Sequence, residues 1–220
     1  MNKILTKKVV FCLVVVLVLF AGGFFYWQSD KIENFLERKE LERMVALSGD
    51  YLIMEDSGEK FIINKKDELK IKVPAQWEIV IGMDMFGLTS ERHVTLHSQD
   101  FSYRPPKGCL VEIQISRLQD KLIDEHDGNF EMFLIDGVKE VKEIINFYKE
   151  NEPEEKEVVR IISVNHNEAL QETKMLKEDM GEQISIKIPT ENRVYVLEGI
   201  FFSEECGKKF EQFLETVSIE

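Results

Sequence analysis

The most constraining feature of this sequence is an uncharged segment near its start, residues 9–27, which reads VVFCLVVVLVLFAGGFFYW. Nineteen helical residues, at about 1.5 Å each, nearly match the ~30 Å hydrocarbon core of a bilayer. An amphipathic helix of a globular core would carry a polar face, and this segment has none. We therefore predict a transmembrane helix at residues 9–27.

The flanks of this segment predict its orientation. Lys3, Lys7 and Lys8 precede it, and lysines on the N-terminal side keep that side in the cytoplasm. Cleavage after Gly23 as a signal peptide is the alternative, and the domain would then be secreted. The aromatic run at 24–27 is typical of a membrane interface and favours a retained anchor. We predict a single-pass protein of a bacterial cell membrane, with residues 1–8 inside and the C-terminal domain outside.

Charge narrows the range of partners. The chain has 28 basic and 41 acidic residues. An acidic surface argues against nucleic acid, and against an anionic membrane face, as partners held by bulk electrostatics. The expected partners are the lipid bilayer, through the N-terminal helix, and a protein of the cell envelope. No cofactor is predicted.

The remaining chain predicts a helical neck at 28–47 and an α+β domain at 48–220, with an antiparallel sheet flanked by helices. Alternating or continuous apolar runs indicate the strands, and apolar residues three or four positions apart indicate the helices. Residues 120–128 are acidic and predict a surface loop. The predicted strands cover residues 51–54, 61–64, 69–73, 77–81, 109–118, 158–164, 184–188, 194–202 and 216–219, with a further short strand around Val94 and Leu96, and the predicted helices cover residues 138–149 and 203–214.

Two cysteines belong to the predicted exported domain, Cys109 and Cys206, whereas Cys12 lies inside the apolar segment. An extracytoplasmic compartment permits disulfides. Sequence does not give the Cα separation that a disulfide requires, so bridged and free thiols both remain open.

Metal binding is a second open question. His93 and His97 lie four residues apart, a spacing that puts both side chains on one face of a strand. A zinc site would need a third ligand, such as His126 or an aspartate. No glutamate lies between the two histidines as in a metalloprotease motif. We interpret them as polar residues of an exposed strand, and keep a metal-dependent hydrolase as the alternative function.

Other chemical motifs are weaker. The acidic run at 124–129 fails the EF-hand register, because Ile123 and Leu134 would occupy positions that require carboxylates. The aromatic residues Trp77, Phe101, Tyr103, Tyr148 and Tyr195 could line a groove but are more typical of a core. We predict no catalytic residue.

Two longer stretches carry a family resemblance. Residues 61–64 and 69–77 place a strand before a Pro-x-x-Trp corner, and residues 194–219 place a strand, a helix and a short last strand in succession. In this order the chain resembles the PsbP-like family over about residues 61–219. The resemblance implies an α/β/α sandwich used as a binding or assembly module, as in photosystem-associated and nuclear-import members, and it implies no catalytic residues. The function expected from the sequence is therefore a membrane-anchored, extracytoplasmic binding or scaffolding domain.

Overall fold

The computed structural model describes residues 39–84, 88–120, 122–125, 132–151, 158–176 and 181–219. The predicted cytoplasmic N-terminus, the apolar segment 9–27 and most of the neck lie outside these residues, as does His126. None of the described helices is both long and apolar enough to cross a membrane.

The chain divides into two compact units, residues 1–42 and 43–220, and the second is described here. It begins slightly before the predicted boundary at Ser48. Val45 and Ala46 are fully buried, and Val45 bridges to Ser116 at the end of a central strand. A 3₁₀ helix, η1 (Ser48–Asp50), then leads into the first strand.

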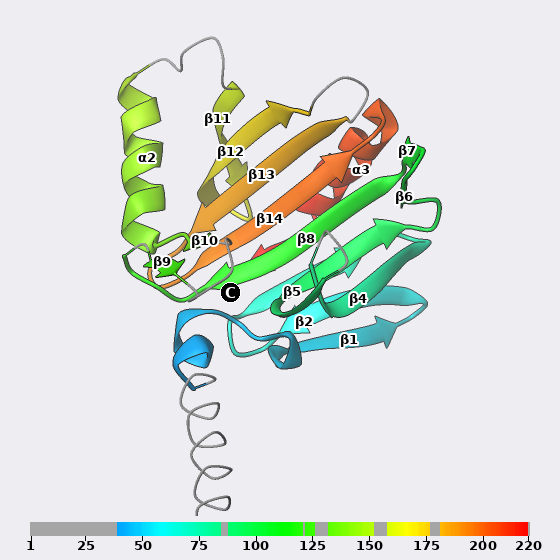
Figure 1. The fold of residues 1–220 in the computed structure, drawn as a ribbon, viewed down its shortest axis with the longest axis horizontal. Helices are drawn as coiled ribbons and strands as arrows, with labels where there is room; N and C mark the ends of the chain where they lie inside the picture. The colour runs from blue at the N-terminus through cyan, green and yellow to red at the C-terminus, as the bar shows by residue number, and fades with distance from the viewer. Residues whose placement is uncertain are drawn as a thin grey trace, which may run out of the picture. The chain divides into compact units, whose positions relative to one another are not determined.

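The larger of the two main sheets has seven strands, all paired antiparallel (Figure 1). Its order is β11-β12-β13-β14-β8-β5-β4. The strands β11 to β14 are consecutive in the chain and pair as successive hairpins, and β8 lies between β14 and β5. The strands are β4 (Trp77–Met83), β5 (Thr89–Ser98), β8 (Cys109–Ser116), β11 (Val158–Val164), β12 (Asn167–Met175), β13 (Glu182–Pro189) and β14 (Val194–Phe201).

A second sheet has four strands in the order β1-β2-β3-β15: β1 (Tyr51–Asp56), β2 (Glu59–Asn64), β3 (Leu69–Val73) and β15 (Ser218–Ile219). Two short hairpins complete the strands, β6 (Ser102–Tyr103) with β7 (Pro106–Lys107) and β9 (Leu122–Glu125) with β10 (Met132–Ile135). The described part therefore contains two main sheets, where the sequence predicted one.

Helices pack against both faces of the seven-stranded sheet. The outer face at β11–β14 is covered by α2 (Val138–Glu150), whose buried residues Val138, Val141 and Ile145 contact that face. The inner face shares a larger core with the four-stranded sheet and with α3 (Glu204–Leu214). Ser203 caps α3, because its Oγ accepts a hydrogen bond from the amide of Cys206.

Alternate side chains of β8 point to the two faces of the seven-stranded sheet. Val111, Ile113 and Ile115 point into the large core, while Glu112 and Gln114 point to the outer face. Glu112 is nevertheless only 7% exposed. This interior strand is therefore largely buried on both faces.

A disulfide joins Cys109, at the start of β8, to Cys206, in the first turn of α3, with a Cα–Cα distance of 5.4 Å. Both residues lie in the large core. Because they are 97 positions apart, the bridge fixes the last helix to a strand near the middle of the chain.

Two predictions of local structure were wrong. Residues 122–125, within the predicted acidic loop, form β9. The nine-residue strand β12 was not predicted, because Ala169 and Leu170 are its only strongly apolar residues before Met175. Both residues are fully buried, Ala169 in the large core and Leu170 under α2, so tertiary packing determines this strand.

Replacing Cys109 and Cys206 together by alanine should lower the free energy of unfolding by about 2–5 kcal/mol, because the unfolded chain regains the entropy of a long loop. Urea denaturation of the two proteins in the same detergent measures the difference. Cys12→Ala, outside the bridge, is the control and should leave the midpoint unchanged. Equal midpoints for the bridged and unbridged proteins would contradict this prediction.

Candidate functional site

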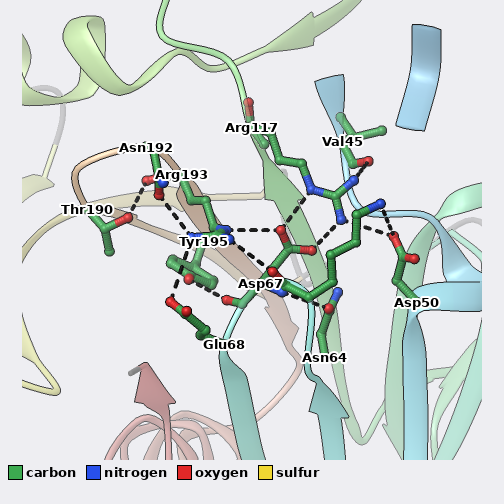
Figure 2. A network of polar contacts seen from close by, with 12 residues as sticks. Val45, Asp50, Asn64, Asp67, Glu68, Arg117, Thr190, Asn192, Arg193 and Tyr195 are labelled. Atoms are coloured by element: carbon green, nitrogen blue, oxygen red, sulfur yellow. Dashed lines mark hydrogen bonds and ion pairs between the residues drawn. The ribbon is translucent and has the colours of Figure 1, made fainter. Parts of the chain in front are cut away.

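A buried carboxylate, Asp67, lies at the centre of the most extensive polar cluster described (Figure 2). It belongs to the turn between β2 and β3, and its side chain is fully buried. Arg117 donates to both carboxylate oxygens, with Nε 2.7 Å from Oδ1. Arg193 donates to Oδ1 from its own Nε at 3.0 Å. One negative charge is thus held between two guanidinium groups.

The surrounding contacts extend this cluster to the backbone. Arg117 also donates to Asp50 Oδ2 at 3.0 Å and to the carbonyl of Val45 at 2.8 Å. The Tyr195 hydroxyl donates to the carbonyl of Asp67 at 2.6 Å, and the amide of Asp67 donates to Asn64 Oδ1. The cluster therefore joins the β2–β3 turn and η1 to β8 and β14, that is, one main sheet to the other.

Electrostatics explain why Asp67 is ionised inside the protein. Burial alone would raise its pKa, but the hydrogen bonds and charges of Arg117 and Arg193 lower the pKa below the ordinary aspartate value. The same contacts with Asp67 and Asp50 outweigh burial and raise the pKa of Arg117. These groups stabilise one another, so we read the cluster as a structural connection between the sheets.

The two histidines considered as metal ligands, His93 and His97, do not converge on one point. His93 contacts Ser90 Oγ through Nδ1 at 2.6 Å, and its Nε2 lies 3.5 Å from Glu112 Oε1. His97 instead faces Glu78, with Nε2 3.8 Å from the carboxylate. Each imidazole thus has its own carboxylate neighbour. Within the described residues, no group of three or more His, Cys, Asp or Glu side chains is placed to hold a metal ion.

A row of polar residues crosses the outer face of the seven-stranded sheet near His93. Glu198 lies directly opposite Glu112 on the neighbouring strand, and Thr95 lies opposite Glu112 on the other side. Burial raises the pKa of Glu198, although Gln183 donates a hydrogen bond to its carboxylate. Sequence reasoning missed this row because its members come from strands that are distant in the chain.

The aromatic residues considered for a groove lie in three places. Trp77 and Tyr195 are buried in the large core, and Tyr148 is partly buried against the core under α2. Phe101 and Tyr103 instead contact each other, with ring centroids 4.8 Å apart, and both contact Phe202. Phe101 and Phe202 pack on Leu110 and Ile200 at one end of the outer face, and Tyr103 stays 41% exposed.

The solvent side of the four-stranded sheet has a different character. Leu52 and Met54 on β1 are 48% and 45% exposed. The strand register places them beside Ile63 and Phe61 of β2, respectively. We call this surface the β1–β3 face and define it by Leu52, Met54, Phe61, Ile63, Lys70 and Lys72, the last two being the β3 partners of Ile63 and Phe61.

The β1–β3 face could hardly be predicted from the sequence. Residues 61–63 read Phe-Ile-Ile, an uninterrupted apolar run that does not show which side of the strand is buried. In the structure Ile62 is fully buried and its two neighbours are partly exposed. Alternation in β3, where Lys70 and Lys72 separate buried residues, was the only signal of a solvent side.

Comparisons with known proteins give a weak structural resemblance. No protein-family model matches the chain, and no curated protein does. The solution structure of cyanobacterial PsbP (CyanoP) from Synechocystis sp. PCC 6803 is 9% identical, with a TM-score of 0.40, over 78% of this chain and 93% of that one. A crystal structure from Bacteroides thetaiotaomicron is 12% identical, with a TM-score of 0.39, over 70% of this chain. The matched part spans 45% of that protein's length. A PsbP-like neighbour is thus found, as the sequence resemblance suggested, and the likeness is weak.

Asp67→Asn should lower the free energy of unfolding at neutral pH by about 3–5 kcal/mol, because it leaves two arginines facing an uncharged amide. Since folding lowers the pKa of Asp67, its contribution is complete above the unfolded value of about 3.9 and is lost as pH falls below it. Urea titrations at pH 7 and pH 3 should therefore show a smaller difference at the lower pH. Glu68→Gln, at the exposed neighbouring position, is the matched control and should have little effect. A similar loss in both variants would contradict the assignment.

His93 should titrate near pH 4, because burial first, and then the charge of Arg92, lower its pKa to about 4. Since the unfolded chain binds this proton first, near pH 6.5, the neutral imidazole's contribution is lost as pH falls from there towards 4. Nitrogen-15 NMR of the imidazole ring measures the midpoint. A midpoint near 6.5 in the folded protein would show that His93 is exposed to solvent.

Proposed function

We propose that this protein is a membrane-anchored, extracytoplasmic domain that acts by binding or scaffolding. Residues 9–27 would anchor it, with residues 1–8 in the cytoplasm. The single observation that carries the binding role is the β1–β3 face. On one side of the sheet it brings the exposed Leu52 and Met54 together with the partly exposed Phe61 and Ile63, which makes a contiguous apolar surface. Such patches on soluble domains mark contact surfaces.

The first strand adds to this argument. In the four-stranded sheet β1 pairs with β2 and is a terminal strand. Its residues Leu52, Ile53 and Met54 are each nearly half exposed, although they point alternately to opposite sides. Natural proteins usually protect an edge strand with lysine, proline or a bulge. An apolar, regularly paired edge strand is therefore suited to a contact.

The disulfide supports a location outside the cytoplasm. Cys109 and Cys206 are bridged deep in the large core. Structural disulfides persist in oxidising compartments and are rare in a reducing cytosol. This agrees with the orientation that Lys3, Lys7 and Lys8 predict for the anchor.

The alternative function, a metal-dependent hydrolase using His93 and His97, has less support. Zinc catalysis needs three protein ligands around one ion. In the structure the two histidines face different carboxylates. His93 faces Glu112 on β8 and His97 faces Glu78 on β4, the two strands that flank β5. The two contacts would have to be broken before both imidazoles could bind the same ion.

The anchor can be tested on the full chain with a C-terminal tag, expressed in bacterial cells. The protein should stay in the membrane pellet after alkaline carbonate extraction, and protease added to intact spheroplasts should remove the tag. Two lysines in the apolar segment, Val15→Lys and Leu17→Lys, should release it, because a charge at the bilayer centre is costly. Lysines at Ile32 and Phe35, in the neck, are the matched control. Recovery of the unaltered chain in the cytosol would overturn the proposal.

A further inference from the structure

We propose that the β1–β3 face lies on the anionic lipid headgroups of the membrane in which the chain is anchored. This inference rests on the proposed anchorage and names the occupant of the binding surface. It assigns Leu52, Met54, Phe61 and Ile63 to contact with the lipid interface, and Lys70 and Lys72 to contact with phosphate groups.

The register of the sheet supplies the geometry of such a contact. Two parallel rows run across the face, one from Leu52 through Ile63 to Lys70 and the other from Met54 through Phe61 to Lys72. Each row changes from apolar at the sheet edge to cationic at the third strand. Amphipathic helices that lie in the membrane interface combine the same two kinds of side chain, apolar residues and lysines.

Lys70 and Lys72 are placed to contact lipid phosphates beside the apolar part of the face. Lys70 Nζ lies 4.7 Å from the centre of the Phe61 ring, so its stem follows the apolar surface while its charge stays at the edge. Lys72 forms an ion pair with Glu59, and neither side chain is buried. An exposed pair of this kind is weak and can be exchanged for a lipid phosphate.

Charge is distributed unevenly along the chain in a way that favours this orientation. Residues 51–73, which form β1–β3, contain five basic and five acidic residues, whereas residues 74–220 contain 16 basic and 30 acidic residues. The total charge therefore argued against an anionic membrane, but it hides one neutral, lysine-bearing sheet. Repulsion of the acidic remainder from an anionic bilayer turns this sheet towards the lipid.

Because the tether is short, a weak contact is sufficient to hold the β1–β3 face on the membrane. Residues 28–42 join the proposed membrane helix to the domain, which begins at Arg43. This segment can span at most about 50 Å when extended and about 23 Å as a helix. The domain thus stays close to the bilayer, where tethering gives an effective concentration in the millimolar range. A small face can then remain on the membrane without a high intrinsic affinity.

Two other occupants would use the same surface, a second copy paired through the edge of β1 and a protein of the envelope. Both would bury Met54 against protein, which excludes oxygen and polar solutes alike. Lipid contact admits oxygen, which is apolar, and excludes a water-soluble nickel chelate. A spin label at position 54 therefore separates lipid from protein and from water.

The test uses the full chain with Cys12→Ser, labelled at Met54→Cys and reconstituted in nanodiscs of phosphatidylcholine and phosphatidylglycerol. Met175→Cys, at a residue that is 75% exposed on β12, is the control position. We expect the label at 54 to be several-fold less accessible to nickel than the label at 175, and more accessible to oxygen. High nickel accessibility at 54, or low accessibility to both reagents, would overturn the proposal.

Charge reversal provides the second arm. Lys70→Glu with Lys72→Glu should raise nickel accessibility at 54 towards the value at 175, and Lys70→Gln with Lys72→Gln should do so to a smaller extent. Lys142→Glu with Lys174→Glu, two exposed lysines on other elements, should change nothing. Equal effects of the two lysine pairs would overturn the assignment. A chain that fails to co-elute with the discs would overturn the anchor as well, whereas a co-eluting chain with a nickel-accessible label would overturn the lipid contact alone.

Discussion

The ionised side chain of Asp67 is the constraint on which the arrangement of the two sheets depends. It is fully buried, and an isolated buried carboxylate would be very costly. Arg117, at the end of β8, and Arg193, just before β14, satisfy it from the larger sheet, while Asp67 itself belongs to the smaller one. Because breaking such a buried cluster leaves unpaired charge, the two sheets are fixed in one relative position.

This arrangement has a consequence for the surface. Asp67 belongs to the turn that joins β2 to β3, so its contacts also hold these two strands in place. The solvent side of the same strands is part of the β1–β3 face. The disulfide acts independently, since it fixes α3 to β8 on the inner side of the larger sheet. The inner faces of both sheets and the buried side of α3 thus form the large core, and the other side of β1–β3 is left for a contact.

Much of this fold could be predicted from periodicity. Alternation in β3, β8 and β14 and the apolar faces of α2 and α3 predicted these elements close to their observed bounds. The strand β12 was missed because its position depends on packing rather than on its own residues. The Asp67 cluster could not be predicted, since Asp50, Asp67, Arg117 and Arg193 are far apart in sequence and charged residues are abundant. Single residues at scattered positions carry no local pattern, whatever their role in the fold.

The central claim is that Asp67 fixes the smaller sheet, with its exposed face, to the larger one. Hydrogen–deuterium exchange of the full chain, with and without Asp67→Asn, tests this directly because it resolves separate regions of the domain. The account predicts faster exchange in residues 51–73, with residues 109–116 and 194–201 remaining protected. Faster exchange of all three regions to the same degree, or unchanged exchange in 51–73, would contradict it.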